Sequence, residues 1–298
     1  MTLAIAAALA ASLVQDERIE MKWTAEKGDR FDLKWAYDET SVRQPGNGPR
    51  LDMSDRRTVE AELEPAEEPG RFVLHLKKVS WSVVHPEYDV RLTFQAGKPP
   101  VTQVKLKVDA KAAASGNVKM ESDNKLDQMT RVMEGEHVLE FDPSNGTSRI
   151  TRNGGSGRNS SVFDLVFLHG PVLKGNVTSG LTWKEELRDV MFPQLVETRA
   201  MSCRVDVKGE QITVKGGFQQ PISQPGALES ISGSYSFLRE FSFHKEGYLS
   251  GSKEESTYTK KVDTKRKDAG AQGFNENSTV TNKQSLTIKK KPAPKPKE

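Results

Sequence analysis

The chain has 298 residues, of which 35% are hydrophobic and 29% charged, with a formal net charge of +3 and one cysteine. This hydrophobic share still supports a core, because a sheet with one solvated face needs only every second residue to be apolar. The single cysteine excludes an intrachain disulfide. Five lysines and one glutamate lie in the last ten residues, so the rest of the chain is close to neutral. Without interleaved aromatic side chains, this charge distribution argues against nucleic-acid binding.

The first fourteen residues, MTLAIAAALAASLV, carry no charged side chain. This run is shorter than the roughly 20 residues that cross a bilayer, and it fits the apolar region of a secretory signal. Ala8-Leu9-Ala10 and Ala10-Ala11-Ser12 both offer small-x-small cleavage sites. The run lacks a preceding Lys or Arg, so the alternatives are a buried N-terminal helix or strand, or a start site assigned too late. We predict a signal peptide over residues 1–14, export to the periplasm or beyond, and no transmembrane span.

Residues 15–152 predict an N-terminal β half. Strict alternation puts four large side chains on one face of a strand, namely Phe31, Leu33, Trp35 and Tyr37. The alternating segment Ile19–Trp23, followed by a turn, predicts a first hairpin with this strand. Between Leu76 and Val79 the apolar positions change parity, which predicts a β-bulge at Lys77-Lys78 and a curved sheet.

Later in this half, the spacing of Leu126, Met129 and Met133 predicts a short helix with Asn124 as its N-cap. The poorly patterned segment 110–122 before it is expected to be a loop. The segment His137–Arg152 predicts a hairpin. It leads into a Gly/Ser-rich stretch, residues 153–161, which is the best linker candidate.

Residues 162–288 predict a C-terminal β half. Apolar alternation on both sides of Gly209 predicts a hairpin over residues 203–214. The polar run Tyr248–Tyr258 predicts a strand at the edge of a sheet. Residues 289–298 are rich in Lys and Pro, which predicts a disordered tail. The expected fold class is mainly β, with about a dozen antiparallel strands in one or two curved sheets, sandwich or half-barrel-like, and one or two short helices.

Motifs for catalysis or cofactor binding are absent from the sequence. It contains no nucleophile elbow, phosphate-binding glycine loop, calcium loop or zinc-ligand spacing. None of the five histidines is paired with another at metal-ligand spacing: His75, His85, His137, His169 and His244. Cys203 lies in a strand-like run, where a small buried residue is favoured over a nucleophile. We therefore predict no catalytic, cofactor-binding or metal-binding residues.

The four tryptophans are candidates for a sugar-binding platform, but each is in phase with aliphatic neighbours and is expected to pack in the core. They are Trp23, Trp35, Trp81 and Trp183. Carboxylates are abundant, and a glycosidase pair could form across a sheet. The default for charged strand residues is exposure to solvent.

Several short signals resemble one class of exported proteins. They are Trp23 with Gly28-Asp29 and Phe31, the hairpin between Gly135 and Gly146, Gly170-Pro171-Val172, Gly180 with Trp183, Gly233 to Phe237, and Phe243 to Leu249. This pattern over residues 17–260 is similar to an uncharacterised family of exported, β-rich bacterial envelope proteins of planctomycete type. The resemblance implies a β-rich fold, possibly in two halves, and no known activity. Lipid-attached members of such families carry an N-terminal Cys, which this chain lacks.

Three functional hypotheses remain. The first is a non-enzymatic exported protein that binds a partner through its curved sheet, with a lipid or other hydrophobic ligand, or an envelope component, as that partner. The second is a carboxylate-based hydrolase acting on envelope glycans. The third is a structural envelope protein without a ligand, tethered by its Lys-rich tail.

Overall fold

The computed structural model describes the chain from residue 25 to residue 292 with gaps. The described residues are 25–46, 48–68, 70–107, 117–131, 133, 135–142, 147–153, 167–169, 179–186, 200–226, 229–246, 248–264 and 275–292. The predicted signal peptide and residues 154–161 of the predicted linker lie outside them.

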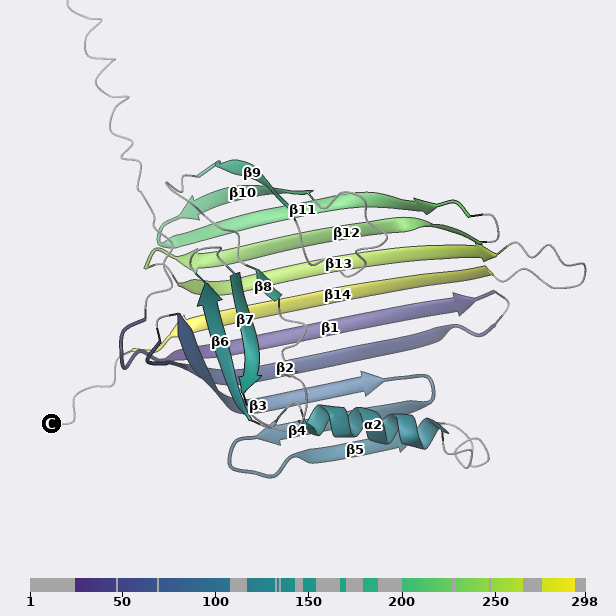
Figure 1. The fold of residues 1–298 in the computed structure, drawn as a ribbon, viewed down its shortest axis with the longest axis horizontal. Coiled ribbons are helices and arrows are strands. Elements are labelled where there is room, and N and C mark those ends of the chain that lie inside the picture. Colours follow the sequence, from purple (N-terminus) through teal and green to yellow (C-terminus); the bar gives the residue numbers. More distant parts are fainter. Residues whose placement is uncertain are drawn as a thin grey trace, which may run out of the picture.

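The described strands form a single 14-stranded sheet in which every pairing is antiparallel. The order along its main path is β8-β7-β6-β3-β2-β1-β14-β13-β12-β11-β10-β9, with β4 and β5 branching from β3 (Figure 1). The fold class is therefore as predicted: mainly β, antiparallel, open and curved. The strands are β1 (Phe31–Pro45), β2 (Leu51–Pro65), β3 (Arg71–Val84), β4 (Tyr88–Gln95), β5 (Val101–Leu106), β6 (Glu136–Asp142), β7 (Thr147–Asn153), β8 (Phe167–His169), β9 (Thr182–Glu186), β10 (Ala200–Lys208), β11 (Gln211–Gln224), β12 (Glu229–His244), β13 (Leu249–Thr264) and β14 (Asn275–Lys290).

The last strand joins the beginning of the chain to its end. β14 pairs with β1 from Phe31↔Lys290 to Pro45↔Glu276, and its other edge pairs with β13. The two sequence halves therefore contribute strands to one sheet. The other edge of β1 is filled by β2 from Phe31 to Arg43. Both edges of β1 are therefore occupied by described strands, and Ile19–Trp23, predicted to form a first hairpin with it, lies outside the described residues.

The predicted bulge in β3 is confirmed. Glu60 pairs with Lys78 and Ala61 with Leu76, which leaves Lys77 as the extra residue. Below the bulge β3 pairs with β6, and above it with β4, along the same edge. A bulge bends its strand, and here the bend separates two branches. β6–β8 cross in front of the main sheet, whereas β4 and β5 extend it (Figure 1).

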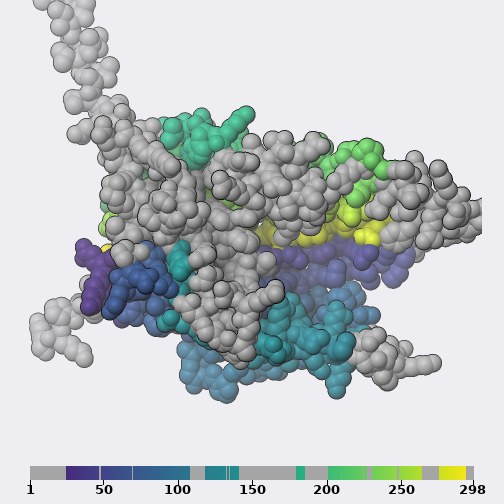
Figure 2. Space-filling model, in the orientation of Figure 1, coloured from purple at the N-terminus to yellow at the C-terminus, as the bar shows by residue number. Residues whose placement is uncertain are grey.

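The helix α2 (Asn117–Arg131) begins seven residues before the predicted cap at Asn124, within the segment expected to be a loop. Its buried residues Val118, Ser122 and Met129 lie on one stripe, which packs against β4 and β5. Thr130 donates a hydrogen bond to the Leu126 carbonyl (3.0 Å) near the helix end. In the space-filling view α2 and the β4–β5 hairpin form one surface along the lower edge (Figure 2).

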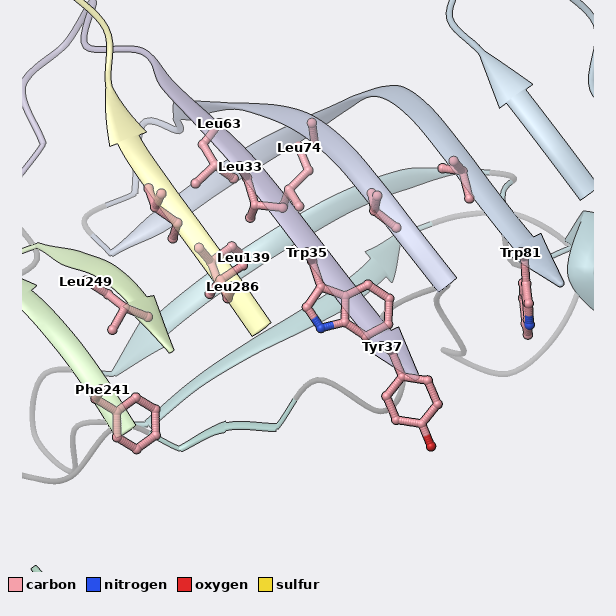
Figure 3. Close-up of a cluster of buried hydrophobic side chains, with 14 of the residues drawn as sticks. Leu33, Trp35, Tyr37, Leu63, Leu74, Trp81, Leu139, Phe241, Leu249 and Leu286 are labelled. Carbon is pink, nitrogen blue, oxygen red and sulfur yellow. The ribbon is translucent and has the colours of Figure 1, made fainter. Parts of the chain in front are cut away.

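One face of the sheet, which we call the buried face, holds the core. Leu33, Trp35 and Tyr37 project from the same side of β1, each at most 5% exposed (Figure 3). Leu139 of β6 lies in the same cluster, so the crossing strands cover this end of the sheet. The opposite face, which we call the open face, carries the alternating polar residues. Apolar burial on one side is the main stabilising contribution.

Two further predictions are corrected. β13 is an interior strand between β12 and β14, although Tyr248–Tyr258 was expected at an edge. Its buried face is polar in the middle and apolar only at Leu249, Tyr258 and Val262, so its composition resembles that of an edge strand. β14 continues to Lys290, so the first two residues of the predicted tail 289–298 belong to the sheet. The hairpin at Gly209 is confirmed as β10–β11.

Candidate functional site

A row of polar and aromatic side chains crosses the buried face directly from strand to strand. Each member is the register partner of the next, and we call these six residues the arginine row: Trp81, Arg57, Tyr37, Gln284, Glu254 and Arg239. The row runs through the hydrophobic core, with Trp35 and Phe241 on one side of it and Tyr235 and Phe237 on the other. Its two guanidinium groups lie on strands four steps apart in the sheet, which is about 19 Å at the usual strand spacing.

Arg57 lies in a fixed set of contacts at one end of the row. Its Nε and one terminal nitrogen donate hydrogen bonds to the two oxygens of Asp55 (3.0 and 2.8 Å), and its side chain is 8% exposed. The guanidinium carbon lies 3.9 Å from the centre of the Trp81 ring. The Trp81 indole in turn donates to Asp55 (2.8 Å). This geometry combines a bidentate ion pair with a cation–π contact, so the charge is both paired and packed.

Arg239 repeats the arrangement at the other end. Its Nε and a terminal nitrogen both donate to one oxygen of Glu254 (2.9 and 2.8 Å), and its side chain is 5% exposed. The guanidinium lies 4.9 Å from the Phe237 ring and 5.4 Å from the Phe241 ring. Between the two clusters, the buried amide oxygen of Gln284 has no hydrogen-bond partner in the described part of the chain. The buried guanidinium groups of Arg57 and Arg239 would be costly without their carboxylate partners.

Two titrating groups adjoin Arg57. The Tyr37 hydroxyl donates to Glu39 (2.6 Å) and lies 2.7 Å from the side-chain oxygen of Asn282. Burial, together with the Glu39 carboxylate, raises the pKa of Tyr37. Lys125 of α2 lies over Trp81 (5.5 Å), and burial lowers its pKa, while Asp55 opposes that effect. The helix thus places a second cation beside the Arg57 cluster.

The open face is hollowed directly behind the arginine row. Three adjoining hollows of about 440, 720 and 470 Å³ run across the strands. The first two share Arg56 and Thr58, and the last two share Glu240 and Lys253. We call the continuous depression they form the trough. Residues of the arginine row reach it only through their backbone, because their side chains are on the other face.

Small side chains form the floor of the trough, and longer ones form its walls, most of them charged but one of them the exposed Leu238. The floor is a second row of register partners: Thr93, Ser80, Thr58, Ala36 and Ser285. Three exposed ion pairs stand beside it, Arg56–Asp38 (3.2 Å), Lys215–Glu240 (3.1 Å) and Lys283–Glu255 (3.0 Å). The depth follows from the contrast between short floor residues and long wall residues.

The structure places most of the residues singled out from the sequence in structural positions. Trp35, Trp81 and Cys203 are each 2% exposed, as predicted for core residues, and Trp183 packs against the core. His75 is exposed and His137 is buried. Trp23 and the side chain of His169 lie outside the described residues. His85 and His244 each stack on a nearby tyrosine, Tyr88 (4.6 Å) and Tyr248 (5.0 Å).

The arginine row and the trough were missed by sequence reasoning. Arg57 and Arg239 are charged residues in phase with apolar neighbours on their strands, which is a signal that could have been read. Within the described ranges, no group of three His, Cys, Asp or Glu side chains is arranged to hold a metal. None of the described helices is long and apolar enough to cross a membrane.

No family model matches the chain, and no curated protein matches its sequence significantly. Among solved structures, one of lipid–protein interactions in lipovitellin is 9% identical, with a TM-score of 0.44. The match covers 92% of this chain but only 26% of the lipovitellin chain. OpdK of Pseudomonas aeruginosa with vanillate is 5% identical, covers 85% and 98% of the two chains, and has a TM-score of 0.17. Such low scores carry no argument about function.

Proposed function

We propose that this is an exported, non-enzymatic binding protein that holds its partner in the trough on the open face of its curved sheet. The trough itself is the observation that carries this proposal. It is open to solvent, it crosses nine strands from β5 to β11, and it is about 38 Å long at the usual strand spacing. A depression of that length fits an extended chain better than a compact small molecule.

The acidic groups of the trough support binding rather than hydrolysis. Asp38, Glu240 and Glu255 each form an ion pair with a neighbouring cation. A glycosidase needs one carboxyl group kept protonated by burial beside a second carboxylate, and these exposed, cation-paired groups do not provide that environment.

Filling the floor of the trough tests the proposal. Ser285 is exposed and lines the central hollow, so Ser285→Trp should block that hollow without disturbing the core. The matched control is Thr279→Trp, on the same face of β14 but outside all three hollows. Binding to heparin, alginate, dextran and poly(dT) would be measured by titration calorimetry. We expect the wild type to bind at least one of them, Ser285→Trp to weaken that binding about 10-fold or more, and Thr279→Trp to leave it unchanged.

Two results would contradict the proposal: binding to none of the four polymers, or binding that Ser285→Trp leaves intact.

Export has its own test. The mature protein isolated from the exported fraction of its host should lack about the first ten to fifteen residues by mass spectrometry. A full-length chain in the cytoplasm would contradict export.

A second candidate is a hydrophobic ligand on the buried face, and one specific observation favours it. Beyond the arginine row, the Phe218 ring contacts two other aromatic rings, with centroids 5.4 Å away for Tyr235 and 5.7 Å away for Phe237. Native mass spectrometry of gently purified protein should then show an added lipid mass that Phe218→Ala reduces. A bare chain that takes up no lipid contradicts this candidate.

A further inference from the structure

Charge along the trough identifies the class of partner. The side chains that line it from the open face include six cations and three anions. The cations are Arg56, Arg91, Lys215, Lys253, Lys283 and Lys289. Because the body of the protein is close to neutral, this local excess of three positive charges is a property of the trough and not of the whole surface.

The excess comes from three particular residues. Each anion of the trough is paired with Arg56, Lys215 or Lys283. Arg91, Lys253 and Lys289 form no ion pair with any described residue. They are also distributed along the trough: Arg91 lines the first hollow, Lys253 the central and last ones, and Lys289 the last one. Every hollow therefore contains a cation that is available to a ligand.

Spacing sets a minimum length for that ligand. Arg91 is on β4 and Lys253 on β13, five strand steps apart along the sheet. At about 4.8 Å per step the two lie roughly 24 Å from one another. A single anionic group cannot reach both residues, so only an extended molecule with repeated negative charges uses all three.

The floor between the cations distinguishes among polyanions. Thr93, Ser80, Thr58 and Ser285 present hydroxyl groups, which donate and accept hydrogen bonds with the hydroxyls of a sugar chain. Single-stranded nucleic acids are instead bound by aromatic side chains that stack on the bases. Trp81 and Tyr37 border the trough only with their backbone, since both side chains are buried on the opposite face.

We propose that the trough binds an acidic polysaccharide in an extended conformation, with its carboxylate or sulfate groups on Arg91, Lys253 and Lys289. This inference rests on the proposed function and specifies its ligand. Binding of this kind is mainly electrostatic, so it weakens as salt screens the charges.

The test compares two triple variants with the same change in charge. The trough variant is Arg91→Ser, Lys253→Ser and Lys289→Ser. The control variant replaces three exposed lysines outside the trough, Lys27→Ser, Lys98→Ser and Lys119→Ser. Affinity for alginate, a carboxylated polysaccharide, and for dextran, a neutral one, would be measured at two salt concentrations, with poly(dT) as a nucleic-acid probe.

We expect alginate to bind and dextran not to bind. The trough variant should lose about 10-fold or more in alginate affinity, together with much of the salt dependence, because it removes three charge contacts with the ligand. The control variant should lose less than about 2-fold. Equal losses in both variants would show general attraction to a basic protein and would overturn the inference.

Other outcomes separate this inference from the function on which it rests. Dextran binding that Ser285→Trp blocks would keep the trough as the binding site but refute an acidic ligand. Binding of poly(dT) in preference to alginate, again blocked by Ser285→Trp, would identify a nucleic-acid site and refute the polysaccharide. Binding that Ser285→Trp does not affect would refute both proposals.

Discussion

The ion pairs Arg239–Glu254 and Lys215–Glu240 lie on neighbouring strands but on opposite faces of the sheet. The first pair has side chains 5% and 22% exposed, and its guanidinium is packed against two aromatic rings. The second has side chains 62% and 32% exposed. Their separations are similar, at 2.8 and 3.1 Å. The surroundings, and not the distance, decide what each pair does.

On the buried face each charged group depends on its partner, because removing one member leaves the other charge with neither a partner nor solvent to stabilise it. On the open face water solvates either member, so its charge is available to a ligand. We therefore expect the arginine row to contribute to the stability of the fold and the trough to contribute to ligand binding. Variants on the two faces should differ accordingly.

The largest effect is expected at Trp81, which is 2% exposed and holds both Arg57 and Asp55. Trp81→Ala should lower the free energy of unfolding by about 5 kcal/mol, the upper end for a large buried aromatic residue. Its neighbour Ser80 faces the trough, and Ser80→Ala should change stability by less than about 0.5 kcal/mol. Urea unfolding followed by circular dichroism compares the two. Similar losses would break the distinction between the faces.

Arg239 comes next. Arg239→Ala should cost about 3 kcal/mol, because the largely buried Glu254 is left as a carboxylate without its cation. The double variant Arg239→Met with Glu254→Leu should return to within about 1 kcal/mol of the wild type, since it removes both charges and keeps the volume. The same urea titration measures both. A double variant as unstable as the single one would show that the pair contributes stability beyond its mutual compensation.

The features that sequence reasoning predicted are local ones. The alternation of Phe31 to Tyr37, the parity change at Lys77 and the turn at Gly209 each depend on a few neighbouring residues, and all three are confirmed. The partners of β1 and β13 could not be predicted in this way. β14 pairs with β1 across more than two hundred residues, and no local pattern encodes a pairing at that separation.

The same limit applies to the site. Arg57 carries a local signal, because it continues the apolar phase of Val59 and Ala61 on its strand. Nothing local places Arg57 in one row with Arg239, since that requires the order and register of five strands. The trough is still harder to predict from the sequence, because its floor forms only when the strand register aligns small residues from β4, β3, β2, β1 and β14.

A smaller, pH-dependent effect is expected at Glu62 of β2, which accepts a hydrogen bond from Lys291, the residue that follows β14. A hydrogen bond from Lys291, with another from Lys77, lowers the pKa of Glu62 from 4.5 to about 2. A pKa lowered by folding contributes stability above the unfolded value, and this contribution is lost as the pH falls from about 4.5 towards 2. Lys291→Gln should therefore cost about 1–2 kcal/mol at pH 7, after allowance for screening, and almost nothing near pH 2.

Thermal unfolding between pH 2 and pH 7 measures this difference. The matched control is Lys34→Gln on the open face, whose pair with Glu60 is long (3.8 Å) and exposed. Its cost should be small at every pH. A Lys291→Gln defect that does not change with pH would show that Lys291 acts by packing rather than by its charge.

The smallest effect is expected at Lys215, the open-face counterpart of Arg239. Lys215→Ala should change the free energy of unfolding by less than about 0.5 kcal/mol, because an exposed pair gains little in water and is screened by salt. It frees Glu240 at the wall of the trough, so the same variant should weaken alginate binding about 3-fold or more at low salt. Stability and binding measured on one preparation separate these effects. A large stability loss with unchanged binding would reverse the roles assigned to the two faces.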